Sequence, residues 1–155
     1  MQKSRGFTLI ELIVVLVILG ILGAFAVPRF VDLQEEARNA TLTGLKGSLH
    51  GAASLAHGKQ LAQQKSKNAD VKVQGDNIKM IGGYPDPNEG IEPMIEDLSG
   101  FNATNGTGTC KEVENVDACI TFVPNGASVP RGCRVEYGVN STTGVDIVAN
   151  GTDCS

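Results

Sequence analysis

The sequence Gly6-Phe7-Thr8-Leu9-Ile10-Glu11 opens an apolar run that continues to Val27 and decides what the rest of the chain can be. From Phe7 to Val27 the only charged residue is Glu11. A helix over this run is about 30 Å long at 1.5 Å per residue, which matches the hydrocarbon core of a bilayer. Residues 7–27 are therefore a predicted membrane-spanning segment.

A short basic leader, residues 1–6, precedes the apolar run and contains Lys3 and Arg5. Positive residues beside a membrane helix mark its cytoplasmic end. A secretory signal peptide has the opposite order, because its cleavage site follows the apolar region. Here the small residue Gly6 comes first, so cleavage after Gly6 would remove the leader and leave the apolar helix on the mature chain.

Glu11 is the one carboxylate in a segment expected to lie in lipid. An unpaired carboxylate in a membrane is costly, so we expect Glu11 to have a partner and a function. After cleavage the nearest cation would be the new amine of Phe7, on the same helix or on a neighbouring copy. The alternative is that Glu11 only interacts favourably with the dipole at the N-terminus of its own helix.

The stretch Gly6-Phe7-Thr8-Leu9-Ile10-Glu11-Leu12 resembles the processing signature of type IV pilins and pseudopilins. The resemblance implies cleavage by prepilin peptidase between Gly6 and Phe7, methylation of the Phe7 amine, and assembly of the mature chain into a helical filament. It also implies that Glu11 pairs with the Phe7 amine of a neighbouring copy. The remainder, including Gly83-Tyr84-Pro85 and a Cys-bounded tail, is similar to the major pilins of mannose-sensitive haemagglutinin pili.

The resemblance also implies partners and a location. The partners are further copies of the chain, prepilin peptidase and the pilus assembly machinery of the inner membrane; no surface ligand is indicated. The subunit would reside in the inner membrane of a Gram-negative bacterium before assembly and in an extracellular pilus afterwards. Surface adhesion, and motility where a retraction motor exists, are the implied functions.

Residues 28–64 are predicted to continue the same helix in amphipathic form. Apolar residues recur at intervals of three and four, at Leu42, Leu45, Leu49, Ala52 and Ala56. A helix from residue 7 to about residue 64 would be roughly 87 Å long. Pro28 lacks an amide donor, so we expect a kink or a local opening there. In the family this region is often non-helical in the packed pilus.

Residues 65–155 are predicted to form one small head, which gives an α+β fold of a long helix packed against an antiparallel β-sheet. Three runs, 118–123, 133–139 and 144–149, read as an antiparallel meander. Its apolar face would pack on the helix, and its other face would be wet, with Arg134, Glu136 and Asp146 exposed. We further expect short strands near 71–74 and 78–81, a loop at 82–87, a short helix at 93–98 and a flexible segment at 102–109.

Four cysteines, Cys110, Cys119, Cys133 and Cys154, lie near the C-terminus and indicate disulfides formed in an oxidising compartment. Four cysteines allow three connectivities. We favour Cys110 with Cys119, closing a small loop, and Cys133 with Cys154, tying the tail to the sheet. Metal binding is the alternative, but no Cys-x-x-Cys spacing occurs.

Charge and composition argue against several other functions. Without Lys3 and Arg5 the chain has 11 basic and 17 acidic side chains, a net charge of −6, so we expect no nucleic-acid partner. His50 and His57 are seven residues apart rather than at the four-residue spacing of a helical ligand pair. The sequence contains no nucleophile-elbow or phosphate-binding motif. We expect no enzymatic activity, no cofactor and no metal; calcium at residues 86–89 is less favoured than simple turn chemistry.

Three alternatives to a pilin remain open. A pseudopilin of a type II secretion system shares the N-terminal signature, but such subunits often lack disulfides. A membrane-anchored binding module that never polymerises would not need Glu11. A DNA-uptake pilus would favour a basic tip, which the acidic composition disfavours.

Overall fold

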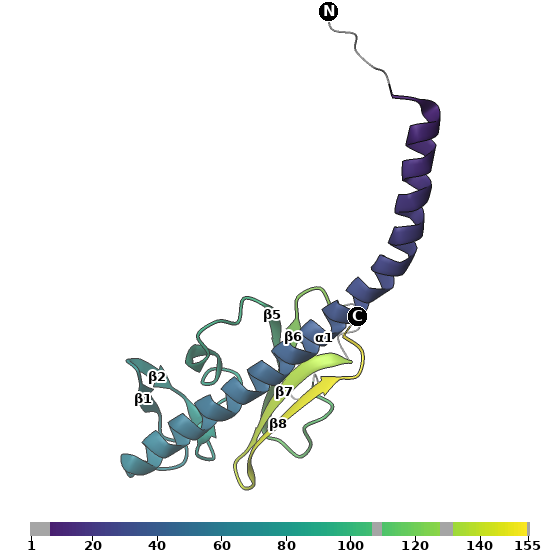
Figure 1. Ribbon diagram of the computed structural model, residues 1–155. Helices are drawn as coiled ribbons and strands as arrows, with labels where there is room; N and C mark the ends of the chain where they lie inside the picture. The colour runs from purple at the N-terminus through teal and green to yellow at the C-terminus, as the bar shows by residue number, and fades with distance from the viewer. Residues whose placement is uncertain (1–6, 107–109, 128–131, 155) are drawn as a thin grey trace, which may run out of the picture.

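The computed structural model describes residues 7–106, 110–127 and 132–154, with the backbone alone for residues 27–32. One helix, α1 (Leu9–Ala62), dominates the chain (Figure 1). Its 54 residues span about 81 Å at 1.5 Å per residue. The helix is two residues shorter at each end than predicted, because Thr8 is the N-cap and Gln63 the C-cap.

The backbone of α1 stays helical through Pro28, which corrects the expectation of a local opening. The helix curves along its length instead of breaking (Figure 1). Proline removes one helical hydrogen bond and crowds the preceding turn, and a long helix accommodates this by bending. Opening of this region on assembly stays a prediction.

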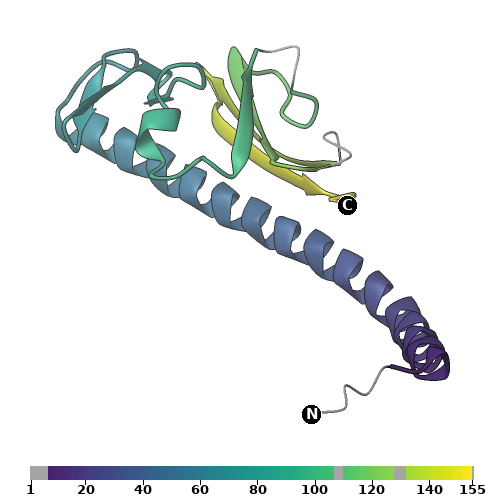
Figure 2. The same cartoon turned by 90° about the horizontal axis from the view of Figure 1, so that it is seen from above.

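The start of α1 projects away from the head (Figure 2). The large apolar side chains of residues 7–25 are all exposed, from 83% for Phe7 to 47% for Ile13 and Val15. By length and composition, residues 9–26 are apolar enough to cross a membrane. This half of α1 has an apolar surface that the isolated chain leaves uncovered.

A four-stranded antiparallel sheet forms most of the head. It consists of β5 (Phe101–Asn105), β6 (Ala118–Pro124), β7 (Cys133–Asn140) and β8 (Gly144–Gly151), in the order β5-β6-β7-β8. The three predicted strands are β6, β7 and β8. Strand β5 corrects the expectation of a flexible segment at residues 102–109; residues 107–109 lie outside the described part of the chain.

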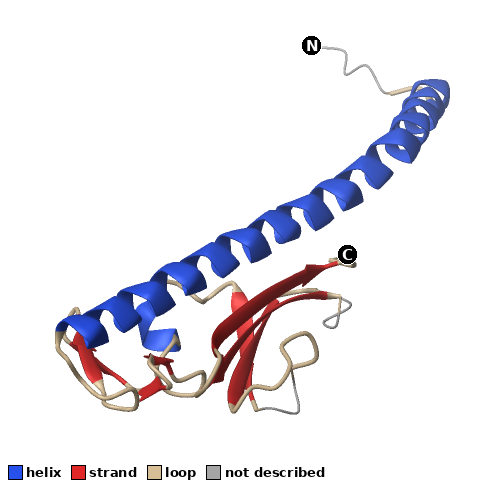
Figure 3. Cartoon of the chain, turned by 90° about the horizontal axis from the view of Figure 1, so that it is seen from below, coloured by secondary structure: helices blue, strands red, loops and turns tan. Residues whose placement is uncertain are grey.

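The core lies between one face of the sheet and the second half of α1 (Figure 3). The helix contributes the predicted apolar stripe, whose members Leu42, Leu45, Leu49, Ala52 and Ala56 are all buried, together with Ala53, which was not predicted. The sheet contributes fully buried side chains such as Ile120, Phe122 and Tyr137. This contact fixes the head on residues 42–60 of α1.

Two small hairpins follow α1 in the sequence, before the strands of the sheet. Strand β1 (Val71–Val73) pairs with β2 (Asp76–Ile78), and β3 (Met80–Ile81) pairs with β4 (Tyr84–Pro85). The second hairpin corrects the prediction that residues 82–87 are entirely loop. Gly82 and Gly83 have φ of 60° and 98°, a conformation that glycine adopts readily, and they make the tight turn between β3 and β4.

A single 3₁₀ turn, η1 (Glu92–Met94), replaces the predicted short helix at residues 93–98. Pro93 lies in this turn, and the backbone of Ile95 is already extended. The segment that follows η1 leads to β5 along the side of α1 (Figure 2). It forms one wall of a groove described below.

Residues 110–117, which we call the covering loop, lie over the sheet face predicted to be wet. Glu136 is fully buried and Arg134 is 5% exposed, so the prediction of exposure is wrong for both and right for Asp146. Gly138 in β7 makes room for the loop, since a Cβ there would lie 2.7 Å from Val116 Cγ1.

The structure has two disulfides, Cys110–Cys119 and Cys133–Cys154. They are the pairing that the sequence analysis favoured. The first joins the covering loop to β6, and the second joins the C-terminal tail to the start of β7. Both bridges therefore fix segments that have little regular structure of their own.

Candidate assembly site

Phe7, Thr8 and Glu11 lie together where α1 begins. The Thr8 amide donates to Glu11 Oε2 at 2.9 Å, and the Thr8 hydroxyl donates to the same oxygen at 2.7 Å. The Glu11 amide donates to Thr8 Oγ1 at 3.4 Å. These reciprocal bonds form a capping box, in which two helix-end donors are satisfied by side chains.

The capping box gives Glu11 a partner in the isolated chain. A local role for Glu11 at its own helix end was the alternative to pairing with a second copy, and a local contact with Thr8 is present. Thr8 was not singled out from the sequence, although Thr8 followed three residues later by Glu11 is the sequence signal of a capping box. The carboxylate is exposed at the helix end and remains accessible to another group.

Apolar side chains surround this carboxylate. Phe7, Ile10, Val14 and Val15 line a shallow depression that also includes Glu11. A carboxylate within an apolar surface is poorly matched to lipid and favours a cation brought by another molecule. Gly6, the predicted cleavage residue, lies outside the described residues, and Pro28 lies further along α1, away from this site.

Arg38 holds the end of the head onto α1. Its Nη1 donates to the Cys154 carbonyl at 2.6 Å, and its Nη2 donates to the Gly126 carbonyl at 2.9 Å. Arg38 belongs to the polar face of the amphipathic pattern, and no sequence motif distinguishes it from the other charged residues there. One guanidinium thus fixes both the C-terminal tail and the turn after β6.

Glu136 holds the covering loop. Its carboxylate accepts backbone N–H bonds from Lys111, Glu112 and Val113 at 2.7–3.1 Å. Arg134 Nε lies 2.8 Å from Glu136 Oε1. A buried carboxylate needs such compensation, and here the chain itself supplies it. The arrangement serves to hold the loop and leaves the carboxylate with no contact to solvent.

The two histidines are not brought together. His57 stacks on Tyr84 with ring centroids 4.6 Å apart, and its Nδ1 lies 2.7 Å from the Gly83 carbonyl oxygen. His50 is exposed. The Asp86 side chain accepts from the Asn88 amide at 2.8 Å, which is turn chemistry. No group of three His, Cys, Asp or Glu suited to a metal occurs among the described residues.

Comparison with known proteins gives matches at the N-terminus and over most of the chain. Residues 1–27 match the family model described as the prokaryotic N-terminal methylation motif. The fimbrial protein of Dichelobacter nodosus is 37% identical over 163 aligned residues, which cover 83% of this chain and 98% of that protein. The type IV major alpha-pilin of Moraxella bovis is 32% identical over 115 residues, 70% of this chain and 67% of that protein.

Two shorter matches are of higher identity. The type IV narrow pilus major component PilA5 of Thermus thermophilus is 48% identical over 55 residues, 36% of this chain and about half, 47%, of that protein. The type II secretion system core protein G of Klebsiella pneumoniae is 40% identical over 55 residues, 36% of this chain and 39% of that protein. No solved structure matches the chain significantly.

Proposed function

The chain belongs to the type IV pilin family, and from this premise we propose how it matures and assembles. It is a structural subunit of a type IV pilus. The feature that carries the proposal is the exposed apolar half of α1, with one carboxylate near its start, on the same continuous helix that bears the folded head. Pilins and fimbrial proteins are among the relatives that match 70% or more of the chain.

Maturation consists of cleavage between Gly6 and Phe7 by prepilin peptidase, followed by methylation of the Phe7 amine. The N-terminal methylation motif over residues 1–27 supports this step. Residues 1–6 act as the leader, residues 7–27 as the membrane and filament-core helix, residues 28–64 as the amphipathic half and residues 65–155 as the head. The mature chain resides in the inner membrane and then in an extracellular pilus.

Assembly brings the Phe7 amine of an incoming copy to Glu11 of a copy already in the filament. Glu11 then exchanges its contact with Thr8 for a contact with an opposite charge, and a copy in the wrong register leaves both charges unpaired. Breaking a buried ion pair is strongly unfavourable, so the pair specifies register more than it stabilises the subunit. In the filament, α1 opens around Pro28, which lacks the amide donor of a helical hydrogen bond.

The experiment has two parts. Mass spectrometry of sheared surface filaments is expected to find this chain beginning with N-methylated Phe7. The Glu11→Gln variant is expected to accumulate in the membrane and to reduce filament yield at least tenfold, while Glu35→Gln, a matched change elsewhere on α1, leaves the yield unchanged. An uncleaved chain recovered only from membranes, or a Glu11→Gln variant that assembles like the wild type, would contradict the proposal.

Surface adhesion, and motility where a retraction motor exists, are the proposed uses of the filament, in partnership with the inner-membrane assembly machinery. The narrower similarity to mannose-sensitive haemagglutinin pilins stays a prediction. A short periplasmic pseudopilus is the second candidate, favoured by the match to core protein G. The two disulfides in the head favour the pilus. Filaments seen on intact cells, rather than only in the periplasm, would distinguish the two.

A further inference from the structure

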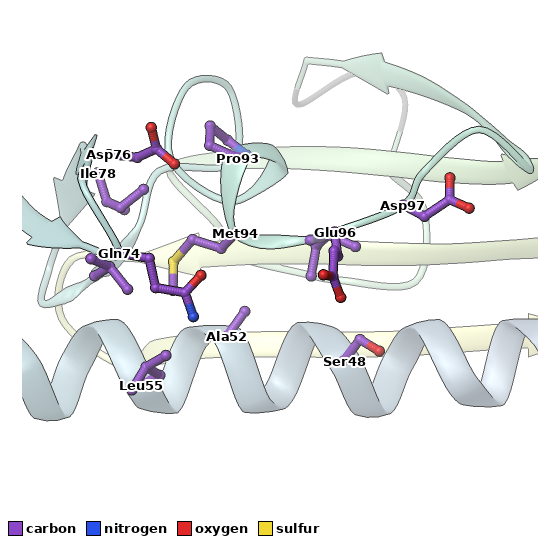
Figure 4. A pocket seen from close by; sticks show the side chains of 12 residues that line it. Ser48, Ala52, Leu55, Gln74, Asp76, Ile78, Pro93, Met94, Glu96 and Asp97 are labelled. Atoms are coloured by element: carbon purple, nitrogen blue, oxygen red, sulfur yellow. The ribbon is translucent and has the colours of Figure 1, made fainter.

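A groove lies between α1, the β1–β2 hairpin and the segment after η1 (Figure 4). Its volume is about 350 Å³ and it is open to solvent on one side. Its lining is mixed, with the apolar side chains of Ala52, Leu55, Ile78 and Met94 beside polar ones. Leu55 is 51% exposed, although the stripe of α1 beside it is buried in the head. The groove therefore has an apolar surface that the isolated chain does not cover.

Three carboxylates border this groove, and no lysine, arginine or histidine lines it. Glu96 faces α1 across the groove, while Asp76 and Asp97 lie towards its two ends (Figure 4). Asp97 accepts a hydrogen bond from the Ser99 amide at 2.8 Å. The described residues offer Glu96 no hydrogen bond or ion pair. Apolar side chains beside an unpaired carboxylate suit a lysine side chain, which has an aliphatic stem and a charged end.

Lys46 lies on the opposite flank of α1 and provides an unpaired positive charge. Successive helical residues are 100° apart, so Ser48 and Leu55 lie on one side of the buried stripe and Lys46 lies on the other. Lys46 is half-buried and, within the described chain, has no ion pair or hydrogen bond. Strand β8, the edge of the sheet that contacts α1, lies on the flank away from the groove (Figure 1).

We propose that the groove receives Lys46 of a second copy of this chain. The inference rests on the proposed function, because that function sets two copies side by side with parallel helices. A Phe7 amine opposite Glu11 of the neighbour implies an offset of four residues. Lys46 of the incoming copy is then level with residue 50 of its neighbour, between Ser48 and Leu55, which line the groove.

The two flanks of α1 thus form complementary halves of one repeating contact. The stem of Lys46 covers the apolar lining around Leu55, and its ammonium pairs with Glu96. Because the two halves are different surfaces of the same chain, the contact is heterologous and propagates along a filament rather than closing a dimer. The Phe7–Glu11 pair sets the register at the start of α1, and the Lys46–Glu96 pair sets it at the head.

Charge reversal tests the contact in the full-length chain in cells that assemble it. Glu96→Lys and Lys46→Glu are each expected to reduce filament yield about tenfold, and the double variant to restore it to within about twofold of wild type. Lys59 is the matched control: it is an exposed lysine of α1 on the groove's own side, so Lys59→Glu combined with Glu96→Lys should not restore the yield. Single variants that assemble like the wild type, or a double variant no better than either single one, overturn the inference.

A second readout does not depend on yield. All four natural cysteines are in disulfides, so Lys46→Cys together with Glu96→Cys is expected to give disulfide-linked ladders from oxidised filaments on a non-reducing gel. Each single cysteine variant should run as a monomer. Filaments that form without a ladder overturn the inference and leave the proposed function intact, whereas a wild-type chain that forms no filaments overturns the proposed function.

Discussion

Glu136 holds the covering loop on the sheet through three backbone N–H groups and the guanidinium of Arg134. Replacing it with glutamine removes the charge and turns an NH₂ group towards donors. Breaking a buried pair in this way typically costs about 3 to 5 kcal/mol. We expect Glu136→Gln to lower the free energy of unfolding of the detergent-solubilised chain by that amount, measured by urea denaturation. Glu114 is exposed on the same loop, so Glu114→Gln should change the free energy of unfolding by less than about 0.5 kcal/mol.

Tyr137 is fully buried, and its hydroxyl donates to the Pro85 carbonyl at 2.8 Å. Burial, with a smaller contribution from the negative charge of Asp86, raises the pKa of the Tyr137 hydroxyl far above its usual range. Its contribution to stability is therefore complete below about pH 10, the pKa of an unfolded tyrosine, and is lost as pH rises above that value.

A variant with Tyr84→Phe leaves Tyr137 as the only tyrosine and keeps an aromatic ring beside His57. On alkaline titration, we expect tyrosinate absorbance to appear only together with the loss of folded-state circular dichroism. Tyrosinate that forms near pH 10 while the fold persists would show that the Tyr137 hydroxyl is accessible, against the burial described here.

At the scale of elements, a disulfide joins the C-terminal tail to the start of β7. The Cys133–Cys154 bridge spans 21 residues of sequence, and both cysteines are buried. The chain-entropy model assigns a loop of this size roughly 3 kcal/mol. We expect Cys133→Ala with Cys154→Ala to lower the free energy of unfolding by about this amount in urea denaturation. A change below about 1 kcal/mol would mean that non-covalent contacts hold the tail, among them the bond from Arg38 to the Cys154 carbonyl and the bond from the Asp153 amide to the Gly132 carbonyl.

The sequence predicts elements well where periodicity and burial coincide. Leu42, Leu45 and Leu49 revealed the head-facing stripe of α1, and the three meander strands alternate in the expected way. Strand β5 was missed because its Asn- and Thr-rich residues are mostly exposed, so no apolar pattern reports its pairing with β6. Arg134 and Glu136 were predicted to lie on a solvent-exposed face of the sheet, because the alternation of residue types cannot show that a distant loop covers that face.

The assembly site was predicted in part for a similar reason. Its N-terminal motif is local, so the cleavage and pairing hypotheses follow from adjacent residues. The Arg38 contact joins residues 116 apart in sequence, and the groove around Glu96 combines α1, the β1–β2 hairpin and the stretch after η1. Only the fold brings these segments together. Contacts between side chains that are far apart in the chain produce no recognisable pattern of residue spacing in a single sequence.

At the scale of the whole molecule, the exposed apolar half of α1 and the folded head are separable. The core contacts begin with Arg38 and Leu42, so a chain of residues 33–155 keeps all of them. We expect this truncated chain to be monomeric without detergent and to unfold within about 4 °C of the full chain, a change equivalent to 1 kcal/mol or less. Size-exclusion chromatography and thermal denaturation would check both. Aggregation of the truncated chain would mean that the head needs the apolar half to fold.

The unbroken course of α1 beneath the sheet has a mechanical consequence. In a filament of such subunits, tension along the filament axis passes from α1 of one copy to α1 of the next. Each head lies beside these helices and is not part of the path that carries the tension. The exposed loops of the head can then vary in sequence without weakening the filament, because no strand of the sheet carries the tension.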